Sequence, residues 1–126
     1  MNSPGYIVFA HGSSIESANQ AVRTVSAEMS RRGGYEQVET AFLEGGTPDL
    51  RGAVETLAAR GVTHIVVIPY FLTLGLHLQR DLPRLVEAAR RGYPEVRIEV
   101  TPPLDGHAAL VDVLLDRAKE PAKETA

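Results

Sequence analysis

Two histidines and one glutamate are the residues of this 126-residue chain best placed to do chemistry. His11 and His77 each follow an apolar segment, and Glu44 follows a third. Imidazole nitrogens bind Zn, Cu, Fe, Co and Ni, and a carboxylate adds an oxygen ligand. The chain has no cysteine, so only histidine, carboxylate, water or substrate could hold a metal. These residue types predict a divalent metal site whose protein ligands are incomplete and leave positions open.

Four apolar segments that alternate with helical patterns must position these side chains. The predicted strands cover residues 6–10, 37–43, 62–71 and 96–101. Nearly continuous apolar strands in strict alternation with helices are typical of a parallel sheet. We expect an α/β fold with a doubly wound, four-stranded parallel sheet in the order 2-1-3-4 and helices on both faces.

Helical periodicity and end signals predict the four connecting helices. A first helix over residues 18–29 is expected to bury Ala18, Ala21, Val22, Val25 and Met29. A second begins at Thr47-Pro48-Asp49, with Thr47 as its cap, and a third begins with Asp81 as its cap after a loop over 72–80. A last helix runs from about residue 106 to 119, with an inward stripe of Leu110, Val113 and Leu114.

The predicted strand order brings the candidate side chains to one crevice. Parallel doubly wound sheets bind ligands beyond the carboxyl ends of neighbouring strands whose following loops diverge. His11 and His77 follow the two strands at that switch point, and Glu44 flanks His11 on the far side. A lone histidine after a strand is usually a hydrogen-bonding loop residue. A shared site is favoured because His11, Glu44 and His77 all follow the carboxyl ends of predicted strands.

The other two histidines have plainer interpretations. His64 lies at the amino end of the third strand, away from the crevice, and is expected to be structural. His107 opens the last helix and could either line the crevice or remain exposed.

The Gly12–Ser14 turn between strand and helix offers an alternative, because its backbone N–H groups could cradle a phosphate. The turn lacks the Gly-Lys of a Walker A loop and the glycines of a dinucleotide fingerprint. Its serines do not stand in Gly-x-Ser-x-Gly, which disfavours a serine hydrolase.

Composition limits the class of protein. A hydrophobic fraction of 44% supports a packed core, and a net charge of −3 gives no reason to expect nucleic acid or an anionic membrane as partner. The amino-terminal apolar run is too short for a signal peptide or a membrane span. We expect one domain over residues 1–120, a frayed tail over 121–126, and a cytoplasmic location.

The ordered motifs resemble a known family. They are His11-Gly12-Ser13, Ala41-Phe42-Leu43-Glu44, Pro69-Tyr70-Phe71-Leu72, and Gly75-x-His77 followed by Asp81-Leu82-Pro83. Together they are similar to the small CbiX/SirB-type sirohydrochlorin chelatases, within the class II tetrapyrrole chelatases. The resemblance implies insertion of Co²⁺ or Fe²⁺, with Ni²⁺ in one branch, into sirohydrochlorin for cobalamin or sirohaem synthesis, without an organic cofactor. It also implies that His11 and His77 bind metal and accept protons, with assistance from Glu44.

The same resemblance implies the substrate contacts. The macrocycle would meet Gly12, Ser13, Ser14, Tyr70, Leu74, Gly75, Leu76 and Arg80. A homodimer would supply the second wall of the cleft. Two departures from the family pattern, Ser14 and Gly45-Gly46, bear on substrate contacts and metal preference. A metal or tetrapyrrole carrier without turnover, using the same two histidines, remains an alternative.

Overall fold

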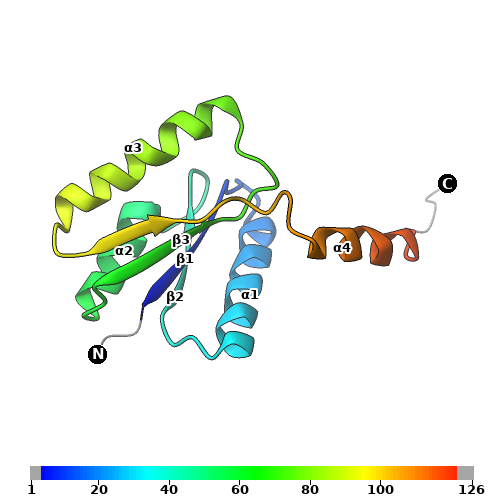
Figure 1. Ribbon diagram of the computed structural model, residues 1–126, viewed down its shortest axis with the longest axis horizontal. Coiled ribbons are helices and arrows are strands. Elements are labelled where there is room, and N and C mark those ends of the chain that lie inside the picture. The colour runs from blue at the N-terminus through cyan, green and yellow to red at the C-terminus, as the bar shows by residue number, and fades with distance from the viewer. Residues whose placement is uncertain (1–3, 122–126) are drawn as a thin grey trace.

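Strands and helices alternate through residues 4–121, the part of the chain that this computed structural model describes (Figure 1). The strands are β1 (Gly5–Ala10), β2 (Val38–Phe42), β3 (His64–Pro69) and β4 (Arg97–Val100). The helices are α1 (Glu16–Gly33), α2 (Leu50–Ala59), α3 (Leu76–Gly92) and α4 (Ala109–Ala118). Strands β2, β3 and β4 are shorter than predicted, whereas β1 begins one residue earlier and α1 is longer. Residues 122–126 of the predicted tail lie outside the described residues.

The strands form one parallel sheet in the order β2-β1-β3-β4, which confirms the predicted topology. Helix α1 packs on one face against β1 and β2, whereas α2 and α3 lie together on the other face (Figure 1). The loops that follow β1 and β3 therefore diverge to opposite faces. The carboxyl ends of these two neighbouring strands form the predicted switch point.

The hydrophobic core lies between the sheet and the α2–α3 layer. Alternate residues of the strands point to this face, and Ile7, Phe9, Ile65 and Val67 are fully buried there. The helices contribute Leu50, Ala53, Val54, Leu57, Leu82, Val86 and Ala89. This packing holds the strand ends, and thus the loops that follow them, in fixed relative positions.

Helix α2 begins differently from the prediction. Asp49, rather than Thr47, is the N-cap, and its side chain accepts a hydrogen bond from the Gly52 backbone N–H at 2.8 Å. An N-cap side chain reaches the N–H two or three residues onward, and Thr47 stands too far upstream to do so.

Helix α3 begins earlier than the prediction, at Leu76 rather than after Asp81. The predicted loop over 72–80 is wrong in its second half, and His77 lies in the first helical turn. Pro83 lies inside the helix. The physical reason is burial: Leu78, Leu82 and Val86 form one stripe that starts upstream of Asp81, and packing this stripe outweighs the cost of an internal proline.

Two predicted buried stripes are largely exposed. Helix α1 turns Asn19 and Ser26 toward the sheet, while Val25 is 42% exposed. Helix α4 projects away from the sheet (Figure 1) and buries none of its residues, and Leu114 is 69% exposed. The predicted packing is wrong for both because no helix or strand within residues 4–121 covers these faces. Within residues 4–121, no helix has the length and apolarity needed to cross a membrane.

Replacing the cap of α2 should weaken the fold measurably. Asp49→Ala removes the hydrogen bond to Gly52 and should lower the free energy of unfolding by about 1 kcal/mol, as measured by urea denaturation. Glu55→Ala, at an exposed position of the same helix, is the control and should stay within about 0.5 kcal/mol of the parent. Equal stability of the two variants would contradict the role of the cap.

Candidate functional site

His11 and Glu44 lie side by side at the carboxyl edge of the sheet. His11 directly follows β1, and Glu44 lies two residues beyond β2. The backbone N–H of Glu44 donates to the carbonyl of His11 at 3.0 Å, which extends the pairing of the strands into the loops. The side chains come within 3.5 Å, from His11 Nε2 to Glu44 Oε1, and are 61% and 70% exposed. The backbone hydrogen bond therefore fixes the positions of the two residues, while their side chains are exposed and accessible to a ligand.

Two glycines allow the β1–α1 and β2–α2 loops to cross in contact. Gly12 has φ +89°, and a Cβ there would lie 1.7 Å from the carbonyl oxygen of Glu44. Gly45 has φ +72°, and a Cβ there would lie 2.8 Å from the backbone of Ser13. Both positions require glycine for its conformation and for space. Gly45, a departure from the family pattern, thus has a structural reason.

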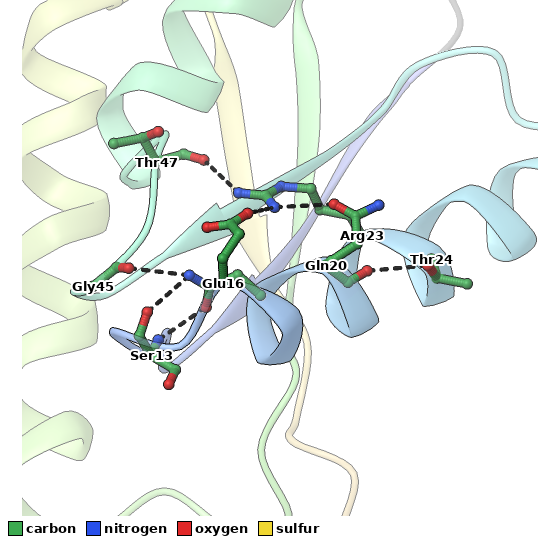
Figure 2. A network of polar contacts seen from close by, with 8 residues as sticks. Ser13, Glu16, Gln20, Arg23, Thr24, Gly45 and Thr47 are labelled. Atoms are coloured by element: carbon green, nitrogen blue, oxygen red, sulfur yellow. Dashed lines mark hydrogen bonds and ion pairs between the residues drawn. The ribbon is translucent and has the colours of Figure 1, made fainter.

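Asn19 fastens the two loops and was missed by the sequence analysis. It is 1% exposed. Its Oδ1 accepts from the Ser13 N–H at 2.9 Å, and its Nδ2 donates to the carbonyls of Ser13 at 2.8 Å and Gly45 at 3.0 Å (Figure 2). The sequence gives little indication that Asn19 is buried, because the apolar residues of this helix predict that another of its faces packs on the sheet.

Arg23 makes a second connection between α1 and the β2–α2 loop. Its guanidinium pairs with Glu16, hydrogen-bonds Gln20 at 3.2 Å and reaches the Thr47 carbonyl at 3.5 Å (Figure 2). It also lies 5.2 Å from the centre of the Phe42 ring. The hydrogen bond from Arg23 holds the pKa of the Glu16 carboxyl below its usual range.

His77 lies apart, in the first turn of α3, beside Arg80. The guanidinium of Arg80 donates to His77 Nδ1 at 3.2 Å. A guanidinium can only donate, so Nδ1 is the acceptor and the proton of the neutral ring lies on Nε2.

The expected convergence of His11, His77 and Glu44 on one ion is not seen in the single chain. Within residues 4–121, no three histidine or carboxylate side chains form a group that could hold a metal ion. The early start of α3 explains the difference, since His77 lies on the helix and not on the predicted loop. The site therefore consists of a His11–Glu44 pair and a separate His77.

Exposed apolar side chains surround these polar groups. Leu76 is 85% exposed, Leu72 64% and Tyr70 37%, while Leu74 is half-buried. Ile15, at the start of α1, is 65% exposed and was not predicted. Large apolar residues gathered at one edge of a domain favour contact with a broad apolar surface.

The remaining two histidines have other partners. His64 begins β3 at the opposite edge of the sheet, where its Nε2 lies 2.6 Å from Glu99 Oε2. Hydrogen bonds from His64 and Arg97 hold the pKa of the Glu99 carboxyl below its usual range. His107 is exposed and lies just before α4, where its Nδ1 accepts from the Ala109 N–H at 3.0 Å.

The geometry of the β1–α1 turn weakens the phosphate alternative. The N–H of Ser13 is bonded to Asn19 Oδ1, and that of Ile15 to Ser13 Oγ at 3.0 Å. Of the N–H groups in the Gly12–Ser14 turn, that of Ser13 is therefore not available to cradle a phosphate.

Comparison with known proteins decides the family. The CbiX family model matches residues 5–121 of this chain. The chain belongs to the CbiX family. This CbiX chain is 30% identical over 116 residues to the chloroplastic sirohydrochlorin ferrochelatase of Arabidopsis thaliana, covering 92% of this chain and 52% of that protein. It is 28% identical to a sirohydrochlorin cobaltochelatase of Methanopyrus kandleri, covering 90% of this chain and 94% of that protein.

A solved structure gives the same fold. The sirohydrochlorin chelatase SirB of Bacillus subtilis subspecies spizizenii, in complex with cobalt, superposes with a TM-score of 0.87 at 26% identity. The match covers 96% of this CbiX chain and 52% of the SirB chain. This chain thus spans about half the length of the Arabidopsis and SirB proteins and nearly all of the Methanopyrus protein.

Removing the Asn19 amide should both destabilise the protein and disturb the site. Asn19→Ala leaves buried loop groups unsatisfied and should lower the free energy of unfolding by about 1–3 kcal/mol in urea denaturation. The amide resonances of Gly12 and Gly45 in NMR spectra should shift as the loops separate. Ser17→Ala, at an exposed position two residues away, should change neither measurement. An Asn19→Ala protein as stable as the parent would refute the role of Asn19.

Proposed function

We propose that this chain is a sirohydrochlorin chelatase, which inserts a divalent metal into sirohydrochlorin and releases two protons. The observation that carries the proposal is the exposed His11–Glu44 pair, held at the switch point of the sheet and bordered by apolar side chains. The names of the relatives in its family support the same reaction. Metallation needs a weak metal ligand, a proton acceptor and a wall for a flat macrocycle, and these residues match those needs.

His11 and Glu44 are proposed to deliver the metal. The Gly12 carbonyl can only accept, so the 3.0 Å contact assigns a proton to His11 Nδ1 and leaves Nε2 as the ligating nitrogen. Metal–ligand bonds to nitrogen and oxygen are about 2.0–2.2 Å long, so two ligand atoms 3.5 Å apart fit around one ion. Two protein ligands leave the remaining positions to water and to pyrrole nitrogens, which allows transfer.

His77 is proposed to accept a pyrrole proton. In the protein alone, Arg80 occupies its Nδ1. Sirohydrochlorin carries carboxylates, which bind a guanidinium more strongly than an imidazole nitrogen does. Substrate binding would draw Arg80 away from His77 and leave Nδ1 open for the proton. The same contact would anchor the macrocycle beside His77.

The rest of the predicted substrate contacts belong to the same proposal. Tyr70, Leu74 and Leu76 would line the macrocycle, with Gly75 at the start of α3 allowing close approach. The Gly12–Ser14 turn would approach the substrate from β1, with the exposed Ser14 hydroxyl as a polar contact.

Metal, partner and location complete the proposal. We propose Co²⁺ or Fe²⁺ as the metal substrate, with Ni²⁺ as a further candidate, and no organic cofactor. A single sheet offers one wall of a cleft, so a homodimer is proposed to supply the second wall. A cytoplasmic location stays a prediction.

Losing either histidine should remove most of the activity. His11→Ala removes the proposed metal ligand, and His77→Ala removes the proposed proton acceptor. Each substitution should lower the enzymatic rate of Co²⁺ insertion, after the spontaneous rate is subtracted, by about 100-fold. The rate is followed by the absorbance change of sirohydrochlorin. His64→Gln, at the opposite edge of the sheet, should keep the parent rate. Wild-type rates in both alanine variants would refute the mechanism, and tight metal binding without turnover by the parent would favour a carrier.

Glu44→Gln should weaken metal capture while preserving the shape of the site. The amide lacks the charge that attracts a cation to His11, so the KM for Co²⁺ should rise by about 10-fold or more. Glu28→Gln, on an exposed surface of α1, is the matched loss of charge and should leave this KM unchanged. An unchanged KM in Glu44→Gln would remove Glu44 from metal binding.

A further inference from the structure

The first two turns of helix α3 are weakly held. The helix begins at Leu76, and its N-cap is Gly75, which has no side chain to accept from the free N–H groups of the first turn. That turn contains no acidic residue, the type that the positive end of a helix dipole favours. Of residues 76–80, only Leu78 is buried, and Leu76 is 85% exposed. One buried side chain therefore holds this part of the helix to the core.

Pro83 weakens the link between these turns and the rest of α3. Proline has no backbone N–H, so the carbonyl of Gln79 lacks the helical hydrogen bond that residue 83 would otherwise donate. The proline ring also disfavours the helical conformation of the residue before it, Leu82. The junction at residues 81–83 is therefore a weak point of the helix.

A second helix start is present at this junction. Asp81-Leu82-Pro83 combines an aspartate that can cap with a proline in the following turn, where N–H groups have no helical acceptor. The same chain uses an aspartate in this way in α2, where Asp49 accepts from the Gly52 N–H three residues onward. By the same spacing, the Asp81 carboxylate would accept from the Arg84 N–H.

A helix capped by Asp81 would keep most of its packing. Leu82, Val86 and Ala89 are 3%, 2% and 0% exposed, and all three lie after Asp81. The losses would be the burial of Leu78 and the helical hydrogen bonds of the first two turns. The longer helix is therefore the favoured state of the free protein, and the shorter helix is a second state that a ligand can select by binding it better.

Unwinding of residues 76–80 would change the surroundings of His77. The 3.2 Å contact from Arg80 to His77 Nδ1 joins residues three apart, which are neighbours on a helix but not in an extended chain. The Gln79 side chain, which donates to the Leu74 carbonyl at 2.8 Å, would also be released. Unwinding would thus free the proposed proton acceptor together with the loop that carries proposed substrate contacts.

We propose that α3 has two starts and that Asp81 is a positioning residue for His77. When the macrocycle binds, residues 76–80 unwind and Asp81 becomes the N-cap of a shorter helix. His77 then separates from Arg80, and its Nδ1 is open for a pyrrole proton. The proposal rests on the proposed function and deepens it, because it names the element whose change of state prepares His77. Asp81 acts only through the helix start.

Steady-state kinetics of Co²⁺ insertion by the purified full chain test this role. Asp81→Val removes the cap but keeps the helix propensity, so kcat should fall about 5-fold, the change that loss of a typical N-cap gives to a two-state equilibrium. Asp81→Asn also removes the charge but keeps the cap, and should keep the parent kcat. The KM for Co²⁺ should stay unchanged in both, because it depends on His11 and Glu44. Glu87→Val, at an exposed position of α3, should change neither value.

Hydrogen exchange separates two helix starts from simple fraying of a helix end. In the parent, the amides of residues 79–82 should exchange about 10-fold or more faster than those of residues 86–89. Asp81→Val should slow the exchange of residues 79–82, because it destabilises the state in which they are unwound, and Asp81→Asn should not. Fraying from Leu76 would respond equally to the two substitutions, since valine and asparagine have similar helix propensities.

Three results would overturn the proposal. They are equal exchange at residues 79–82 and 86–89 in the parent, a parent kcat in a folded Asp81→Val protein, and an equal loss of kcat in Asp81→Val and Asp81→Asn, which would assign the effect to the charge. The exchange of the parent tests the two starts even if Asp81→Val does not fold. A parent that inserts no metal would refute the proposed function, while the exchange rates would still decide whether α3 has two starts.

Discussion

The crossing of two loops in direct backbone contact is the constraint on which the rest of the site depends. The β1–α1 and β2–α2 loops approach so closely that Gly12 and Gly45 have no room for a Cβ, and the buried amide of Asn19 fastens them. The parallel pairing of β1 with β2 brings the loops together, and the contact turns that pairing into a fixed position for His11 and Glu44. An exposed pair of side chains thus rests on a rigid backbone.

This arrangement suits a protein that must release what it binds. Closed metal sites surround an ion with four protein ligands and hold it tightly, whereas His11 and Glu44 form an exposed pair. His77 stands apart on another element and is engaged by Arg80. Separating the proposed metal-binding pair from the proposed proton acceptor would leave room between them for a macrocycle that contacts both.

The sheet order and the positions of His11 and Glu44 could be predicted from the sequence because they follow from strand periodicity and the rules of parallel connections. Predictions of helix ends and buried helix faces were wrong where tertiary packing, and not local sequence, determines them. Asp81 resembles a cap, yet the buried stripe from Leu78 onward extends α3 past it. The apolar stripes of α1 and α4 were predicted to be buried, but Val25 and Leu114 are exposed in the single chain. Helical periodicity identifies an apolar face but does not show which surface, if any, packs against it. Asn19 could not be found because its role depends on loops far apart in sequence.

The single sheet of this chain, which offers one wall of a cleft, has a consequence for concentration. A second wall supplied by another molecule would make part of the folding free energy depend on how often two molecules meet. In a chain that contains both units, the linker would replace that encounter with an effective concentration in the millimolar range. Joining two such units in one chain would therefore remove the dependence on dilution without adding any contact. It would also free the two halves to diverge, since a substitution would no longer be repeated on both sides of the cleft.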